Sequence, residues 1–261
     1  MPVEWIRCIR MGEAMKATDF EVRHRLLLTV LLLWISYQVY VIDRLNITLY
    51  IVHLDPHHAG RGNAIYHAIY GFAALLIALG ASLRTWASSY AVRGATHECS
   101  SKSNLICANG PYRYVRHPLY VGAFLVAIAI GCFESRLGFA ILPVGAAILI
   151  LRLVNREEAD RAAEDQDAFQ EYSRRVPRFL PLLRPRVPAG VENPDWSRAF
   201  RVETFAWGAF VTMVAFSIVL DDNIGSAFGL AAILAWGGSR FLMSGPRKDP
   251  KPNSDTGSAH T

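Results

Sequence analysis

The sequence predicts an all-α integral membrane protein, a polytopic helical bundle with about six transmembrane segments. Of the 261 residues 52% are hydrophobic, the mean hydropathy is +0.22, and the apolar residues come in long blocks. Most of these blocks approach the roughly 20 residues that cross a bilayer core. The blocks are 26–42, 64–83, 119–133, 137–154, 200–220 and 224–243.

The third and fourth blocks predict a helical hairpin. Pro118 precedes the third block, which suits the start of a helix, and only Glu134, Ser135 and Arg136 separate the two blocks. The third block is short, so a re-entrant segment is the alternative to a full span.

The distribution of Lys and Arg predicts the topology. Basic residues precede the first block, fill the segment 84–116 and the connector after Val154, and follow the sixth block. The segments 43–63 and 221–223 contain few of them. We therefore expect a multi-pass protein with both termini in the cytoplasm, and the compact size of the chain suggests a bacterial inner membrane. The same asymmetry accounts for the net charge of +5, so membrane lipids and not nucleic acids are the expected partners.

Metal binding is not expected. The four cysteines show no spacing typical of a metal site. His53, Asp55, His57 and His58 have the ligand types of a zinc or copper site, but Pro56 interrupts a regular helix between them. An exposed polar loop accounts better for this cluster.

The run 110–122, GPYRYVRHPLYVG, places cations, a histidine and aromatic residues directly beside an apolar block. Glu157 and Glu158 follow the fourth block, so the hairpin brings both groups to one membrane face. Carboxylates, guanidinium groups and tyrosines together suit a zwitterionic ligand that carries an amino group, a carboxylate and an adenine. The candidate cofactor-binding residues are Tyr112, Arg113, Arg116, His117, Pro118, Tyr120, Gly122, Glu157 and Glu158.

These motifs, together with Tyr172 and the segment VPRFLP at 176–181, resemble the isoprenylcysteine carboxyl methyltransferase and phospholipid methyltransferase superfamily. The resemblance covers residues 79–185. It implies a membrane methyltransferase that uses S-adenosylmethionine at the cytoplasmic end of its helices and takes a lipid-like or prenylated acceptor from the bilayer. The residues that it implies for the cofactor pocket are Arg116, His117, Pro118, Tyr120, Glu157 and Glu158.

The resemblance also suggests a division of the chain. Residues 1–78 form an N-terminal cytoplasmic segment and the first spans, and residues 79–185 form the methyltransferase core. Residues 186–243 form a Pro-rich connector and two further spans, and the polar residues 244–261 form a disordered tail.

Methyl transfer from a sulfonium requires alignment of the two reactants more than acid or base catalysis. A carboxylate acceptor needs only a cation to orient it, and Arg84 and Arg178 are the candidate catalytic residues for this role. Anchoring to lipid headgroups is the alternative role for both arginines. A lipid amine, an isoprenoid acid and a small hydrophobic thiol are the other acceptors that remain open.

Two other functions are the alternatives to methyl transfer. A membrane sterol-type reductase would use NADPH and shares an Arg/His-Pro-x-Tyr-like segment, but it favours a polar residue where this chain has Leu119. A transporter or membrane scaffold would place paired ionisable groups within its spans, and only His67 and Glu203 stand in or beside apolar sequence here. Both alternatives are therefore less favoured than the methyltransferase.

Overall fold

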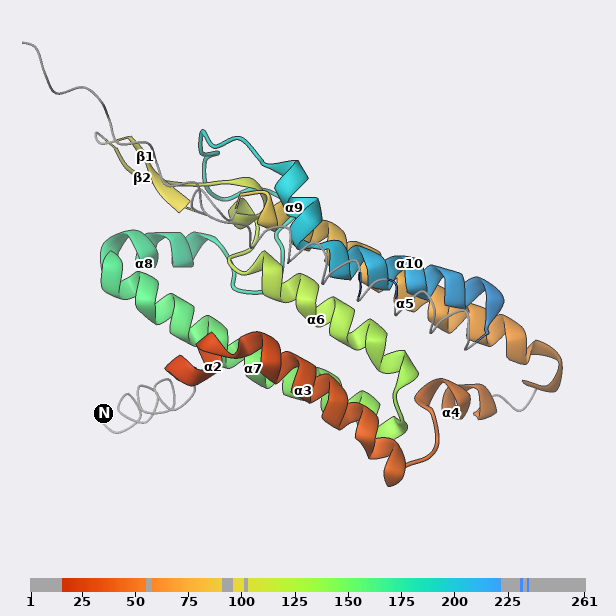
Figure 1. Cartoon of the computed structure of the whole chain (residues 1–261). Coiled ribbons are helices and arrows are strands. Elements are labelled where there is room, and N and C mark those ends of the chain that lie inside the picture. Colours follow the sequence, from red (N-terminus) through yellow and green to blue (C-terminus); the bar gives the residue numbers. More distant parts are fainter. Residues whose placement is uncertain are drawn as a thin grey trace, which may run out of the picture.

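The computed structural model describes residues 16–54, 58–90, 96–100 and 103–221, and the single positions 231 and 234 (Figure 1). Its α-helices are α2 (Asp19–Arg23), α3 (Arg25–Gln38), α4 (Ile47–His53), α5 (His58–Ser88), α6 (Pro118–Ile130), α7 (Arg136–Glu164), α8 (Gln166–Arg175), α9 (Trp196–Val202) and α10 (Thr204–Val219). Short 3-10 helices are η1 (Val39–Val41), η2 (Gly110–Arg113) and η3 (Gly131–Phe133).

The described part of the chain is predominantly helical, as the sequence predicted. One difference is a two-stranded antiparallel sheet of β1 (Thr96–Ser100) and β2 (Ser103–Ala108), in which Thr96 pairs with Ala108. The strands lie between α5 and η2, where the sequence predicted only a connecting loop. Both strands are short, β1 is mostly polar and the apolar residues of β2 are consecutive, so neither shows the alternation that marks a strand.

Two described helices are long and apolar enough to cross a membrane, namely Ala64–Ser88 within α5 and the whole of α7. The pair α9 and α10, bent by 64° at its break, raises the number to three if it is counted as one span. The helices α3 and α6 are shorter and apolar. The six-span topology therefore stays a prediction, since only positions 231 and 234 of the expected sixth span (224–243), and none of the expected tail (244–261), are described.

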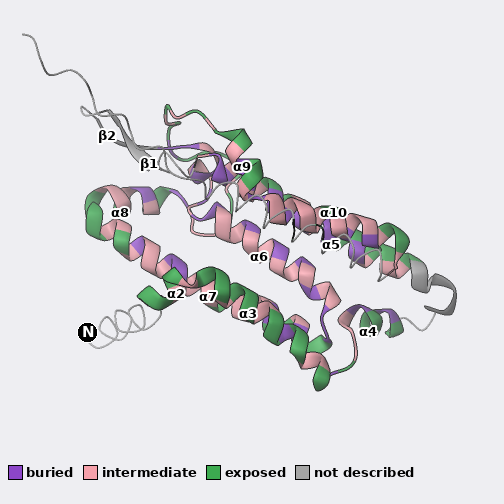
Figure 2. Ribbon diagram, viewed as in Figure 1, coloured by how far each residue is buried: buried purple, intermediate pink, exposed green. Residues whose placement is uncertain are grey.

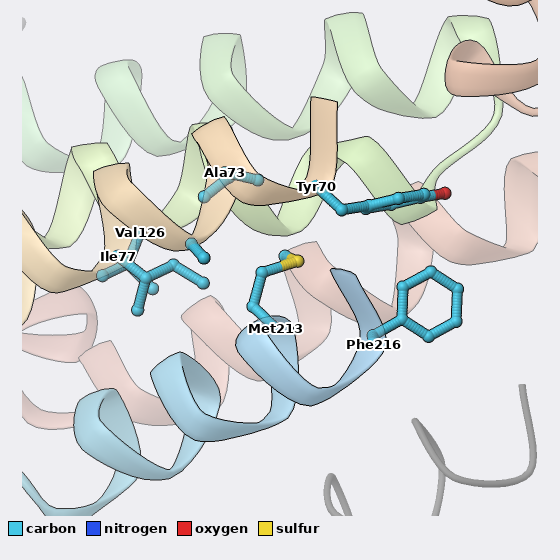
Figure 3. Close-up of a cluster of buried hydrophobic side chains, with 8 residues drawn as sticks. Tyr70, Ala73, Ile77, Val126, Met213 and Phe216 are labelled. Atoms are coloured by element: carbon cyan, nitrogen blue, oxygen red, sulfur yellow. The ribbon is translucent and has the colours of Figure 1, made fainter. Parts of the chain in front are cut away.

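The helices pack in two groups that are joined by the link between α6 and α7. In the first group α5 packs against both α6 and α10, and a buried cluster lies among these three helices (Figure 3). Tyr70 and Ile77 of α5, Val126 of α6, and Met213 and Phe216 of α10 contribute to it. In the second group α3 packs along α7. The chain reverses between α6 and α7, but α6 makes its most extensive contacts with α5 (Figure 1).

The outer faces of the two groups are apolar and exposed. Figure 2 shows exposed residues along α3. Among those on α3 are Leu27, Val30 and Trp34, and on α7 Val144 and Ile148. Continuous apolar surface of this kind is stable beside lipid and costly beside water. The surface and the long apolar helices agree with the prediction of a membrane protein.

The helix α2 is tied to α7 by an ion pair. Thr18 and Glu21 form a capping box at its start, and Glu21 also accepts hydrogen bonds from Nε of Arg152 at 2.7 Å and from Nη2 at 2.8 Å. The hydrogen bonds from Arg152 and Thr18 lower the pKa of Glu21 to about 2, against an ordinary value of 4.5. The carboxylate therefore stabilises the fold wherever it stays ionised.

We expect this contact to make the protein sensitive to acid. A lowered pKa gives stability that is fully present above pH 4.5 and is lost as the pH falls toward 2. Over that range the Tm of the detergent-solubilised wild type should fall more steeply than the Tm of Glu21→Gln. Glu164→Gln serves as a control that retains the contact and should follow the wild type. Equal slopes for wild type and Glu21→Gln would contradict the expectation.

Candidate functional site

The predicted site residues gather at one end of the helix bundle, where α6 begins and α7 approaches its end (Figure 1). Pro118 is the first residue of α6, which suits its fixed φ angle and its lack of an N–H group. Backbone hydrogen bonds join the segment before α6 to the segment after α8. The N–H of Arg116 donates to the carbonyl oxygen of Pro177 at 2.9 Å, and that of Leu182 to Tyr114 at 3.1 Å. Two motifs of the predicted core, the run 110–122 and the segment 176–181, therefore lie side by side.

Glu158 is the centre of the site. Its Oε1 accepts a hydrogen bond from Nη1 of Arg116 at 2.8 Å and from Nε2 of His117 at 2.9 Å. Its Oε2 accepts from Nε of Arg178 at 3.1 Å, and Nη2 of Arg178 also pairs with it. The carboxylate is thus held by groups from the segment before α6 and from the segment after α8.

Glu157 also contacts the start of α6, and its side chain is more exposed to solvent than that of Glu158. The hydroxyl of Tyr120 donates to its Oε1 at 2.6 Å, and Nδ1 of His117 lies 3.8 Å from its Oε2. The side chain of Glu157 is 37% exposed, whereas that of Glu158 is 10% exposed and that of His117 is 2% exposed. His117 therefore lies beneath the pair, and Glu157 is the carboxylate that a ligand can reach more easily.

Arg116 keeps one buried donor without a partner. Its Nε makes no hydrogen bond to any described residue and is shielded from solvent. Burial lowers the pKa of Arg116, and the charge of Glu158 opposes this effect. A guanidinium group stays protonated in proteins, so the free N–H is a ready donor for an acceptor atom brought by a ligand.

Tyr112 and Arg113 lie beside the site, where they contact the segments that carry it. Tyr112 packs with Tyr172 and Val176 in a second buried cluster, and its carbonyl oxygen accepts a hydrogen bond from the Tyr172 hydroxyl at 2.7 Å. Burial raises the pKa of the Tyr112 hydroxyl to about 12. Nε of Arg113 donates to the carbonyl oxygen of Val187 at 3.1 Å. The structure places both side chains in the wall of the site and not among the groups that contact Glu158.

The two predicted catalytic arginines occupy different places. Arg178 joins the Glu158 cluster, whereas Arg84 forms an ion pair with Glu203, its Nε lying 2.6 Å from Oε2. Glu203 lies between α9 and α10 and was noted in the sequence only as a charge at the edge of an apolar block. A charge in such a position predicts that a partner exists, but it does not predict which residue that partner is.

Gly122 serves the packing of α5 against α6. A Cβ atom at this position would lie 2.6 Å from the carbonyl oxygen of Gly80 and 2.5 Å from Cγ of Arg84. Its hydrogen therefore permits a close approach of the two helices. Phe179 is a further neighbour that sequence reasoning did not select, with its ring centroid 6.2 Å from that of His117.

The described residues contain no group of three or more His, Cys, Asp or Glu side chains that is arranged to hold a metal ion. In the histidine-rich cluster near position 55, Asp55 and His57 lie outside the described residues.

Comparison with known proteins identifies the segment that carries most of this cluster. Residues 72–162 match the isoprenylcysteine carboxyl methyltransferase (ICMT) family. We call this stretch the ICMT segment. It contains Arg116, His117, Tyr120, Glu157 and Glu158, so the resemblance predicted from the motifs is confirmed. Arg178 and Glu203 lie beyond the ICMT segment.

Curated relatives show the same partial similarity. A protein-S-isoprenylcysteine O-methyltransferase of Schizosaccharomyces pombe is 32% identical over 44% of this chain and 51% of its own length. The cobalt-zinc-cadmium resistance protein CzcN of Cupriavidus metallidurans is 32% identical over 47% of this chain and 58% of its own length. A methanethiol S-methyltransferase of Crocosphaera subtropica is 38% identical over 28% of each chain. The chain thus spans about half the length, or less, of these relatives. No solved structure matches it.

Proposed function

We propose that the protein is an integral membrane methyltransferase that uses S-adenosylmethionine and acts on a lipid-like or prenylated acceptor. The observation that carries the proposal is the convergence of Arg116, His117 and Tyr120 on Glu157 and Glu158. The two glutamates follow the other three residues by 37 to 42 positions in the chain, and all five residues fall within the ICMT segment. A bundle held together only by helix packing has no need of such a cluster of charges at one end.

The residues present suit the cofactor. Glu157 is exposed enough to accept a hydrogen bond from an ammonium group, and the buried Nε of Arg116 is a donor suited to a carboxylate. The ring of Phe179, near His117, offers an apolar surface for a flat ring system. The site therefore offers both charges that a zwitterionic amino acid group needs.

In the proposed mechanism the protein acts by binding and alignment. S-adenosylmethionine supplies an electrophilic methyl group on a sulfonium centre. Hydrogen bonds join His117 to Glu158 and Tyr120 to Glu157, and they hold the two carboxylates in one geometry. These side chains therefore need to move little when the cofactor binds. Arg178, which is 36% exposed, is the cation placed to orient an anionic acceptor at the edge of the cluster. Alignment of two reactants supplies about 7 to 11 kcal/mol of the barrier in favourable cases.

The proposed acceptor follows from the apolar surroundings and from the relatives. The site lies at the end of helices whose outer faces are apolar, so an acceptor dissolved in the bilayer can approach it. The name of one relative refers to isoprenylcysteine and that of another to methanethiol. A prenylated carboxylate is the first acceptor to test, and a small hydrophobic thiol is the second. We propose that the site lies at the cytoplasmic face of a multi-pass protein with both termini inside, following the distribution of Lys and Arg, and that this membrane is a bacterial inner membrane, as the compact size of the chain suggests.

The proposal is tested by ligand binding to the full chain in lipid nanodiscs. Titration calorimetry should show that S-adenosylmethionine binds and that NADPH does not. The variant His117→Ala should lower the affinity for S-adenosylmethionine about tenfold or more, since it frees Glu158 from one of its donors. The matched control Glu164→Gln changes a carboxylate at the end of α7, outside the cluster, and should bind as the wild type does. Selective binding of NADPH would favour a reductase, and binding of neither ligand would reject both enzymes.

Acceptors are then compared with a radiolabelled methyl donor. Transfer of the label to a prenylated cysteine analogue supports the proposed acceptor class. Transfer only to methanethiol would replace it with a small thiol.

A further inference from the structure

Glu203 is a buried carboxylate outside the ICMT segment. Its side chain is 3% exposed and lies at the break between α9 and α10. Its Oε2 accepts a hydrogen bond from Nε of Arg84 at 2.6 Å, and its Oε1 accepts from Nη2 of Arg84 at 3.2 Å. Ser88 donates to the same Oε1 at 2.7 Å. A bidentate pair of this kind fixes the plane of the guanidinium group.

Arg84 extends this contact to the helix that carries the site. Its Nη1 donates to the carbonyl oxygen of Leu119 at 3.2 Å. Leu119 stands in the first turn of α6, between Pro118 and Tyr120. The same turn begins at His117, the N-cap residue of α6. Arg84 thus contacts the backbone of the turn whose side chains bind Glu157 and Glu158.

Gly122 allows the arginine to reach this place. A Cβ atom there would lie 2.5 Å from Cγ and 3.2 Å from Cδ of Arg84. The stem of the arginine therefore lies directly against α6, and its head is held by Glu203 on one side and by Leu119 on the other. A side chain fixed in this way can transmit the position of one helix to another.

We infer that Glu203 and Arg84 are positioning residues for the cofactor site, through which α9 and α10 fix the first turn of α6. This inference rests on the proposed function for its chemical meaning. The sequence suggested that Arg84 orients the acceptor by direct contact. In this inference Arg84 acts instead through the backbone of α6. The helices α9 and α10, which the ICMT segment does not include, therefore contribute to the geometry of the site.

The first test measures the first turn of α6 without any ligand. Hydrogen exchange is followed by mass spectrometry for peptides that cover residues 117–124 in the full chain in nanodiscs. Glu203→Gln and Arg84→Met should each raise the exchange rate there about fivefold, because the contact with Leu119 loosens. The double variant should show the same increase and not the product of the two, since both changes break one chain of contacts.

Trp207→Phe is the matched control. It removes the hydrogen bond of 2.9 Å from Nε1 of Trp207 to Oγ1 of Thr85, which also joins α10 to α5 but does not involve Arg84. Exchange over 117–124 should stay at the wild-type rate in this variant. An equal increase in Trp207→Phe would mean that general docking of α10 is responsible, and it would overturn the inference. Wild-type exchange in Glu203→Gln would overturn it as well.

The second test measures affinity for S-adenosylmethionine in the same four variants. Glu203→Gln, Arg84→Met and the double variant should each weaken binding about five- to tenfold, while Trp207→Phe stays within twofold of the wild type. If the wild type binds and Glu203→Gln binds equally well, the inference fails and the proposed function stands. If the wild type does not bind, the proposed function fails, and hydrogen exchange still decides whether Glu203 positions α6.

The double variant distinguishes loss of the contact from misfolding caused by an unpaired charge. Arg84→Met alone leaves the carboxylate of Glu203, which is 3% exposed, without its partner, and Glu203→Gln alone leaves the charge of Arg84 without one; an unpaired charge is costly in a buried place. The double variant leaves no such charge, and exchange in it is compared with exchange in Arg84→Met. Equal rates in these two proteins support the inference, and a further increase in the double variant overturns it.

Discussion

Replacing Glu158 with Gln is expected to abolish measurable binding of S-adenosylmethionine, with a loss of affinity of about 100-fold or more. Glu158 forms ion pairs with Arg116 and Arg178 and accepts a hydrogen bond from His117. Its amide replacement leaves two guanidinium groups without a counter-charge and points an N–H group at donors. Breaking a buried pair of this kind costs on the order of 3 kcal/mol. Calorimetry on the full chain in nanodiscs measures the loss directly.

The variant Glu157→Gln is the comparison for this result. Glu157→Gln removes the more exposed carboxylate, whose hydroxyl donor is Tyr120, and leaves the Glu158 cluster intact. It should weaken binding about tenfold with little change in Tm, whereas Glu158→Gln should lower both. Binding by Glu158→Gln at the wild-type level would show that the cluster is structural and would remove the main support for the cofactor site.

Gly122→Ala is expected to have the largest effect on stability. A Cβ atom at this position would lie 2.6 Å from the carbonyl oxygen of Gly80, and this is a backbone atom that moves only with its helix. The helices α5 and α6 must then separate, at a cost of about 1 to 3 kcal/mol in the free energy of unfolding. The separation also displaces the first turn of α6, so affinity for S-adenosylmethionine should fall. Thermal unfolding in detergent and calorimetry measure the two effects.

Gly71→Ala is the matched control for this substitution. A Cβ atom at Gly71, also within a helix of the bundle, has no atom within 4 Å. Alanine there should leave Tm unchanged or raise it, since it favours the helix by about 0.5 to 1 kcal/mol over glycine. A similar loss of Tm in both variants would contradict the role assigned to the contact between α5 and α6.

The sequence predicted the helices well where hydropathy alone defines them. The blocks 64–83 and 137–154 fall within α5 and α7, because a long apolar run in a membrane protein leaves a helix as the favourable structure. The block 200–220 conceals a bend of 64° between α9 and α10. Glu203 lies at that bend, and its pairing with Arg84 depends on how α10 packs against α5. Such a contact between distant segments leaves no periodic signal in the sequence.

The contacts of the site could also be predicted only in part from the sequence. The order and spacing of the motifs placed Arg116, His117 and Tyr120 opposite Glu157 and Glu158, and the structure brings these side chains into hydrogen-bonding distance. Their assignment to the cofactor stays a prediction. The sequence did not separate the roles of Arg84 and Arg178, since both are arginines beside apolar blocks. Only the packing shows that one arginine contacts Glu158 and the other contacts Glu203.

The arrangement around Glu158 has a consequence for how the protein is made. Its partners Arg116 and His117 precede it in the chain, but Arg178 follows it by 20 residues, after α8 has turned the chain back. During synthesis from the N-terminus, Glu158 therefore leaves the ribosome before its last counter-charge. A nascent chain that stops at residue 162 already contains the whole ICMT segment, yet its central carboxylate lacks Arg178. The shortest chain able to complete the cluster must extend past that arginine, well beyond the boundary of the family.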